Sequence, residues 1–226
     1  MATPLRWLAY GLVALGAAVT GAYVHERLSA PVPAAAAPIV HILEAPPKAG
    51  DAEAGVPELR PDFTLKDAGG RPHPIREWDG KPLMINFWAS WCAPCRREIP
   101  LLNRLQSEPA LKDLQIVGIA VDFPQDVQNF LKKIPVHYPV LIGEQDGLDA
   151  ANAFGVQAIA FPFTAFVDRQ GHVLSLHLGE LHEDQARSTL AVLERVDRGE
   201  LTPATGRDAL RAALARLPKP LPAPAD

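Results

Sequence analysis

The sequence predicts an α/β domain with a mixed central sheet and helices on both of its faces. Short apolar runs of strand length alternate with segments of helical periodicity, which is typical of a sheet covered on both sides. The last two strand-like runs, residues 163–167 and 172–178, are joined by a turn of hairpin length and predict an antiparallel pair. A chain of 226 residues with 48% hydrophobic residues can form one such domain with additional segments.

The folded domain is expected over residues 59–200, where hydrophobic patterning marks its strands. Residues 62–71 predict a short strand that enters a Gly-Gly turn. Residues 83–88 are continuously apolar, as expected for a strand buried on both faces, and this strand leads to the two cysteines. The other predicted strands are residues 114–121, 139–142, 163–167 and 172–178.

Helical periodicity marks the segments between these strands. Residues 96–106 predict a helix that begins at the cysteine motif and is kinked by Pro100. The other predicted helices of the domain are residues 127–133, 146–154 and 183–196.

The C-terminal residues 201–226 are expected to add one helix and a tail. Residues 205–208 resemble a capping box that begins at Thr205, and leucines follow on one helix face. The last residues, 218–226, are rich in proline and predict an extended tail.

The N-terminal part of the chain predicts a membrane segment and a tether. Residues 7–24 are an uncharged apolar run, just long enough to span a bilayer as a helix. We expect residues 1–30 to be a retained anchor, although the small residues 34–37 offer a signal-peptide cleavage site. Residues 31–58 are rich in proline and alanine and predict a semi-extended tether.

Composition and charge exclude several classes of protein. The net charge is -4 and the basic residues are scattered, so we expect no nucleic-acid partner. A charged fraction of 21% excludes a polytopic membrane protein. The chain has only 2 cysteines, which excludes a scaffold held together by several disulfides.

The two cysteines, Cys92 and Cys95, form a Cys-Ala-Pro-Cys motif at the predicted start of a helix. Unpaired backbone N–H groups at a helix N-terminus carry partial positive charge, which favours the thiolate form of Cys92. Cys95 follows one turn later and can attack a mixed disulfide formed on Cys92. We therefore expect a two-electron redox switch with Cys92 exposed at the helix tip and Cys95 buried.

A metal site is the alternative interpretation of this pair, because Cys-X-X-Cys is also half of a zinc site. The chain has no second cysteine pair, and His172, His177 and His182 recur at a spacing that suits no common ligand motif. We therefore expect no metal site and assign these histidines to the surface or the hairpin. A copper-binding chaperone that uses reduced Cys92 and Cys95 as soft ligands is the alternative function.

The segment NFWASWCAPCRREIP, from Asn86 to Pro100, resembles the active-site segment of thioredoxin-fold proteins, above all those of the membrane-tethered TlpA/ResA/CcmG branch. The similarity covers roughly residues 62–196 and includes Phe161-Pro162-Phe163-Thr164. The resemblance implies a thioredoxin fold, thiol-disulfide exchange, and a cis-proline at Pro162 that faces the disulfide.

The same resemblance implies the roles of the site residues. Cys92 becomes the attacking thiol, Cys95 the resolving thiol and Glu98 the acid/base carboxylate. No separate cofactor is implied, because the cysteine pair itself carries the electrons. The residues implied to bind substrate are Trp91, Pro94, Phe161 and Pro162.

Two roles are open to Glu98 on sequence grounds. It lies one turn beyond Cys95 on the same predicted helix face, so its carboxylate can accept a proton from the resolving thiol. A solvated surface glutamate is the alternative. Asn86 replaces the buried aspartate that the resemblance to plain thioredoxins implies at this position, which favours Glu98 as the carboxylate of the site.

The sequence therefore predicts a membrane-tethered thiol:disulfide oxidoreductase. The dipeptide Ala93-Pro94 lacks a histidine that would make the disulfide a strong oxidant, so we expect reduction of client disulfides. The resemblance implies protein disulfide clients such as apo-cytochromes or copper-site proteins, and a membrane thiol-disulfide electron donor. A peroxiredoxin-type peroxidase is a weaker alternative, because the Pro-X-X-X-Thr-X-X-Cys motif is absent.

The expected location follows from the anchor and the redox chemistry together. We expect a single pass through the bacterial inner membrane with the catalytic domain in the periplasm. A soluble periplasmic protein is the alternative if residues 1–30 are cleaved.

Overall fold

A seven-stranded mixed sheet forms the centre of the described part of the chain, residues 55–156 and 161–218 of the computed structural model. Its strands are β1 (Thr64–Asp67), β2 (Pro72–Pro74), β3 (Leu83–Trp88), β4 (Gln115–Val121), β5 (Val140–Gly143), β6 (Phe163–Val167) and β7 (Val173–Leu178). The strand order is β2-β1-β5-β4-β3-β6-β7. Strands β3, β4 and β5 are parallel, whereas β6 pairs antiparallel with both β3 and β7.

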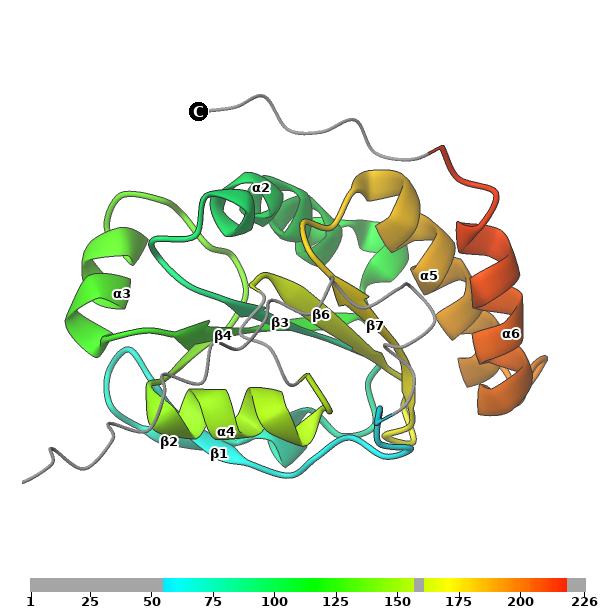
Figure 1. Ribbon diagram of the computed structural model, residues 1–226, viewed down its shortest axis with the longest axis horizontal. Coiled ribbons are helices and arrows are strands. Elements are labelled where there is room, and N and C mark those ends of the chain that lie inside the picture. Colours follow the sequence, from blue (N-terminus) through cyan, green and yellow to red (C-terminus); the bar gives the residue numbers. More distant parts are fainter. Residues whose placement is uncertain (1–54, 157–160, 219–226) are drawn as a thin grey trace, which may run out of the picture. The chain divides into compact units, whose positions relative to one another are not determined.

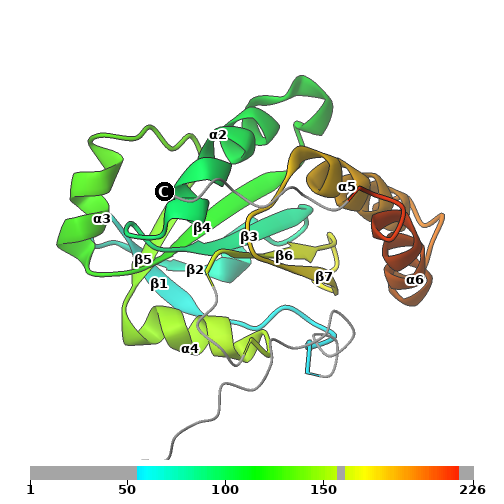
Figure 2. The ribbon, with the colours of Figure 1, turned by 45° about the horizontal axis from the view of Figure 1, so that its top comes forward.

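Helices cover both faces of the sheet, as the sequence predicts. They are α2 (Ala93–Ser107), α3 (Pro124–Leu131), α4 (Gln145–Ala153), α5 (Glu183–Asp197) and α6 (Pro203–Leu214), with short 3-10 helices η2 (Ile75–Trp78) and η3 (Pro109–Leu111). Helix α4 lies on one face, and α2 and α5 lie on the other (Figures 1 and 2). Helix α6 packs against α5 and β7.

Strand β3 is buried on both faces, which explains its continuous apolar sequence. On one face, Phe87 meets Phe154 at the end of α4, with 5.6 Å between the ring centroids. On the other face, Met84 packs in the cluster that contains Leu102 of α2. Alternate side chains of a strand point to opposite faces, so helices on both sides leave no polar position in this run except Asn86.

The described chain begins to pair with the sheet before the predicted domain boundary. The Val173 N–H donates to the Glu58 carbonyl over 2.9 Å, although the sequence assigns Glu58 to the tether. The predicted anchor, most of the tether and the end of the tail lie outside the described residues. Among the helices that are described, none has the length and apolar character needed to cross a membrane.

Helix α6 starts earlier than the sequence predicts. Thr202 is its N-cap, because the Thr202 Oγ1 accepts the Thr205 N–H over 3.2 Å and the Thr205 Oγ1 accepts the Thr202 N–H over 2.9 Å. The predicted capping box that begins at Thr205 is therefore wrong. Pro203 explains the shift, since proline has no N–H to satisfy and is favoured in the first turn of a helix.

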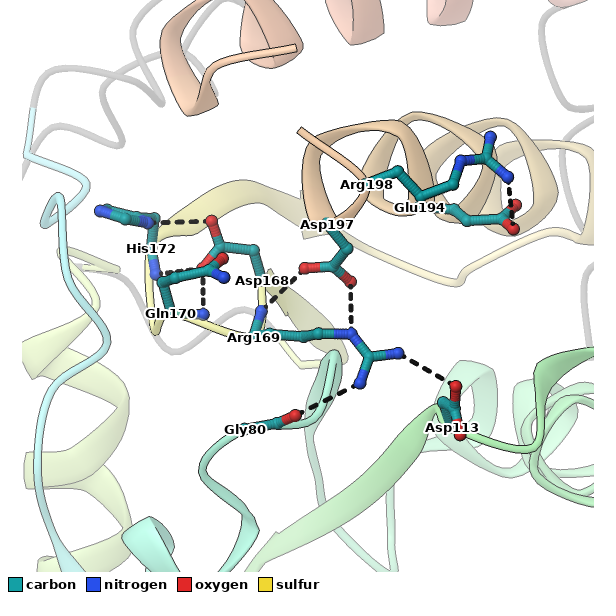
Figure 3. Close-up of polar contacts among 9 residues, drawn as sticks. All are labelled: Gly80, Asp113, Asp168, Arg169, Gln170, His172, Glu194, Asp197 and Arg198. Atoms are coloured by element: carbon teal, nitrogen blue, oxygen red, sulfur yellow. Dashed lines mark hydrogen bonds and ion pairs between the residues drawn. The ribbon is translucent and has the colours of Figure 1, made fainter. Parts of the chain in front are cut away.

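A polar network holds the turn between β6 and β7 against the end of α5 (Figure 3). The buried Asp168 carboxylate accepts the His172 backbone N–H over 2.8 Å and pairs with the His172 ring over 2.9 Å. The Arg169 guanidinium pairs with Asp113 over 3.1 Å and with Asp197 over 3.7 Å. These contacts fix the hairpin that brings β7 alongside β6.

Gly118 on β4 has no side chain and so leaves room for the rings of Tyr138 and Trp88. A Cβ at this position would lie 2.9 Å from Tyr138 Cε2 and 3.0 Å from Trp88 Nε1. We expect Gly118→Ala to lower the free energy of unfolding by about 1–3 kcal/mol, because bulky rings must move. Denaturant unfolding measures this change.

Gly147→Ala is the matched control for this prediction. Its Cβ would meet Val121 at an ordinary 3.4 Å, and alanine favours the helical conformation of α4. We expect this variant to be as stable as the wild type or slightly more stable. Equal losses in the two variants would contradict the account of Gly118.

Candidate active site

The two cysteines form a disulfide at the N-terminus of α2. Strand β3 ends at Trp88, a short loop follows, and Cys92 is the N-cap of the helix. The Cys92 Sγ accepts the Cys95 N–H over 3.3 Å. A helix N-terminus thus directs a backbone donor at this sulfur, which would favour a thiolate on Cys92 after reduction.

The two sulfur-bearing residues differ little in exposure in this oxidised state. Cys92 is 5% exposed and Cys95 is 0% exposed, so Cys92 is far less accessible than the sequence predicts. Phe161 and the buried Trp88 belong to the apolar cluster around the pair, which explains this shielding. Trp91, by contrast, is 67% exposed beside Cys92.

Two hydrogen bonds that the sequence did not reveal hold the loop before the cysteines in place. The Asp122 carboxylate, at the end of β4, accepts the Ser90 backbone N–H over 3.0 Å and the Ser90 hydroxyl over 2.6 Å. The two residues are 32 positions apart in the chain. Their contact ties the cysteine loop to the neighbouring strand and so limits its movement.

Glu98 is buried on α2, which excludes a solvated surface glutamate. Its side chain is 1% exposed. The Glu98 Oε1 accepts the Asn86 Nδ2–H over 2.8 Å, and the Glu98 Oε2 accepts the Leu181 N–H over 2.8 Å. Burial raises the pKa of the Glu98 carboxyl from 4.5 to about 7, against the lowering effect of these two hydrogen bonds.

A row of directly paired residues crosses the sheet beneath Glu98. Asn86 of β3 is paired with Gly118 of β4 and with Thr164 of β6, and Thr164 is paired with His177 of β7. The Asn86 Nδ2–H also donates to the Thr164 Oγ1 over 3.0 Å. Directly paired residues present their side chains on the same face, so this row supplies polar groups to the face that α2 covers.

The Phe161–Pro162 peptide bond is cis, in agreement with the expectation for this motif. Pro162 is buried, and its carbonyl accepts the Gly179 N–H over 2.8 Å. Phe161 packs against the cluster that contains both cysteines. The structure thereby places Phe161 beside the cluster that holds the disulfide. Pro94 lies partly exposed in the first turn of α2.

Each of the three regularly spaced histidines has its own local contact. His172 pairs with Asp168, the His177 Nε2 lies 3.2 Å from the Glu180 carbonyl oxygen, and His182 is the N-cap of α5. Within the described ranges, no group of three or more His, Cys, Asp or Glu side chains is arranged to hold a metal ion. The structure thus places these histidines in separate local roles.

A disulfide is suited to thiol-disulfide exchange when its first sulfur meets a helix N-terminus and its second sulfur is buried, one helical turn before a buried carboxylate. Together with the surrounding sheet and helices, this site defines a thioredoxin-fold thiol-disulfide oxidoreductase. The chain belongs to the AhpC/TSA family, whose sequence model matches residues 56–175.

Named relatives agree with the resemblance found in the sequence. Thiol-disulfide oxidoreductase ResA of Geobacillus thermodenitrificans is 32% identical over 131 residues, which are 58% of this chain and 73% of that protein. Thioredoxin-like protein YneN of Bacillus subtilis is 30% identical over 61% of this chain and 81% of its own. A Chlorobium tepidum crystal structure described as thiol:disulfide interchange protein DsbE gives a TM-score of 0.54 at 29% identity, over 62% of this chain and 96% of its own.

The raised pKa of Glu98 predicts that Glu98 makes the oxidised protein less stable as the pH rises from 4.5 to about 7. In this interval the folded state keeps the Glu98 proton while the unfolded state has released it, so rising pH favours unfolding. The full effect is on the order of 3 kcal/mol. The free energy of unfolding of the wild type, minus that of Glu98→Gln, should therefore fall by this amount between about pH 4 and about pH 8.

Denaturant unfolding of both oxidised proteins across this pH range measures the difference. Glu194→Gln, which removes the charge of an exposed glutamate on α5, is the matched control. A constant difference between wild type and Glu98→Gln across the range would show that the pKa of Glu98 is ordinary.

Proposed function

We propose that this oxidoreductase reduces disulfides in extracytoplasmic client proteins while residues 7–24 hold it at a membrane. The observation that carries the catalytic part of the proposal is the arrangement of α2. One helix presents Cys92 at its N-terminus, Cys95 in its first turn and the buried Glu98 one turn later. Thiol-disulfide exchange requires three groups: a thiol that attacks, a second thiol that resolves the mixed disulfide, and a group that accepts the proton of the second thiol.

In the first step, the Cys92 thiolate attacks one sulfur of the client disulfide. A mixed disulfide forms between Cys92 and the client, and the other client sulfur leaves as a thiolate. The hydrogen bond from the Cys95 N–H to the Cys92 Sγ supports the thiolate that this step needs.

In the second step, Cys95 resolves the mixed disulfide. The Cys95 thiol gives its proton to the Glu98 carboxylate, and the resulting thiolate attacks the Cys92 sulfur. The second client sulfur then leaves as a thiolate, so the client gains two electrons and the Cys92–Cys95 disulfide forms. A pKa of about 7 lets Glu98 accept and release a proton near neutral pH.

Client binding is assigned to the surface around the disulfide. The exposed Trp91 offers an apolar contact, and Phe123, which follows Asp122 and is 62% exposed, extends the apolar surface of this end of the sheet. Pro94, Phe161 and Pro162 complete the proposed set, and an extended client segment would pair with backbone groups next to Pro162. The sulfur of the client can then reach Cys92.

The proposed direction, location and partners rest on the sequence. Ala93 and Pro94 place no positive charge between the cysteines, which favours a reductant over a strong oxidant. Electrons to reduce the Cys92–Cys95 disulfide would come from a membrane-bound dithiol. The proposed clients are apo-cytochromes or copper-site proteins in the bacterial periplasm, where disulfides persist.

The division of labour between the cysteines is tested by trapping. Cys95→Ser should accumulate mixed disulfides through Cys92, because nothing remains to resolve them. Non-reducing electrophoresis and mass spectrometry of the adducts, after expression in the native compartment, measure this.

Cys92→Ser is the matched control and should give few adducts. Abundant adducts on Cys92→Ser with none on Cys95→Ser would reverse the assignment. Tight copper binding by the reduced pair, without any disulfide turnover, would instead favour the copper-chaperone function.

The anchor is tested by cell fractionation. The mature chain should sediment with membranes and resist extraction by salt, because residues 7–24 are an uncharged and mainly apolar run. A variant without residues 1–30, exported by a cleavable signal peptide, should be soluble. A wild-type protein recovered in the soluble periplasm, with a new N-terminus near residue 37, would exclude a retained anchor.

A further inference from the structure

One peptide group links His177 to the buried carboxylate. The carbonyl of Glu180 lies 3.2 Å from the His177 Nε2, and the N–H of the same peptide, which belongs to Leu181, donates to the Glu98 Oε2 over 2.8 Å. A carbonyl oxygen can only accept a hydrogen bond. The His177 Nε2 must therefore carry the proton in this contact.

We propose that His177 is a positioning residue, which holds and polarises the Glu180–Leu181 peptide so that its N–H donates to the Glu98 carboxylate. The proposal deepens the proposed function, because it rests on Glu98 being the proton acceptor of the resolving thiol. The proposed role of His177 involves no contact with the sulfurs of Cys92 and Cys95 or with the client.

Sheet register explains why a residue of β7 reaches this site. His177 pairs directly with Thr164, and Thr164 pairs with Asn86, which donates to Glu98. His177 thus stands on the sheet face that α2 covers, two strands away from Asn86. Sequence spacing places it among three histidines without distinguishing it from the other two.

The segment after His177 joins two parts of the site. The Gly179 N–H donates to the Pro162 carbonyl over 2.8 Å, and the Leu181 N–H donates to Glu98. His177 braces this segment from the strand side. If this segment became mobile, the hydrogen bonds to the Pro162 carbonyl and to the Glu98 carboxylate would both weaken.

Hydrogen bonds in series strengthen one another, because a carbonyl that accepts a bond polarises its own N–H. The His177 donor should therefore strengthen the bond from Leu181 to Glu98 and favour the ionised carboxylate. The Leu181 bond already lowers the pKa of Glu98 against the larger effect of burial. Removing His177 should weaken this effect and raise the pKa of Glu98.

Other titratable groups also act on this part of the site. The charge of Glu180 raises the pKa of Glu98, and Arg97 pairs with Glu180 over 2.7 Å. Burial lowers the pKa of His177, the hydrogen bond to the Glu180 carbonyl raises it, and the charge of His182 lowers it, and the net lowering favours the neutral ring. The buried Tyr138 faces Glu98 from the segment before β5, and its pKa is raised, so it also stays neutral.

The test is the pKa of the Glu98 carboxyl in the oxidised full-length protein, measured by carbon-13 NMR. His177→Leu removes the donor and should raise this pKa by about 0.5 to 1 pH unit. His177→Gln keeps an N–H at the same distance along the side chain and should restore a pKa close to that of the wild type. His73→Leu, which removes a histidine on the edge strand β2, at the opposite end of the strand order from β7, is the matched control and should leave it unchanged.

An unchanged pKa in His177→Leu, or an equal shift in His73→Leu, would overturn the proposal. A second measurement uses the wild type alone and so does not require any variant to fold. Nitrogen-15 NMR at neutral pH should show the His177 proton on Nε2, and a proton on Nδ1 alone would also overturn the proposal.

Kinetics then separate this inference from the proposed function. Resolution of a mixed disulfide at pH 7 should slow about two- to fivefold in His177→Leu, as the ionised fraction of Glu98 falls. A raised pKa with unchanged kinetics would support His177 as a positioning residue and refute Glu98 as the proton acceptor. An unchanged pKa would refute the role of His177 alone.

Discussion

The burial of one carboxylate constrains the whole site. Glu98 is 1% exposed, and a buried carboxylate is tolerated only where hydrogen-bond donors meet it. Asn86 supplies one donor from the central strand, and the Leu181 backbone supplies the other from the loop before α5. Helix α2 must therefore keep a fixed position over β3 and β6. The same helix carries the disulfide, so the carboxylate that needs these donors also fixes the cysteines above the sheet.

The chemistry of the disulfide follows from its place at a helix terminus. Cys92 caps α2, so a backbone N–H points at its sulfur, and no charged side chain lies between Cys92 and Cys95 in the sequence. Asp122 holds the preceding loop through Ser90, which keeps the cap in place. Cys95 lies in the first turn of the same helix, where it is fully buried and bonded to the Cys92 sulfur. Local helix geometry thereby separates the position proposed for attack from the position proposed for resolution.

Much of the domain could be predicted from local patterns, and the errors have local causes. Strands β3 and β6 have the bounds that apolar runs predict, because every residue of both strands is buried. Helices α3 and α6 begin earlier than predicted, at Pro124 and Pro203. Hydrophobic periodicity marks only the buried face of a helix, whereas proline in the first turn sets where the helix starts.

The sequence by itself determined the redox-active cysteine pair, the helix on which it stands and the strand that leads to it, because each depends on neighbours within a few residues. Only the tertiary structure decided the surroundings of Glu98. Thr164 lies 78 positions from Asn86, and Leu181 lies 83 positions from Glu98, so sheet register and loop docking alone bring them together. The donor of Leu181 is a backbone N–H, which no side-chain pattern can reveal. The raised pKa of Glu98 likewise arises from burial, a property that the chain acquires only when distant segments exclude water.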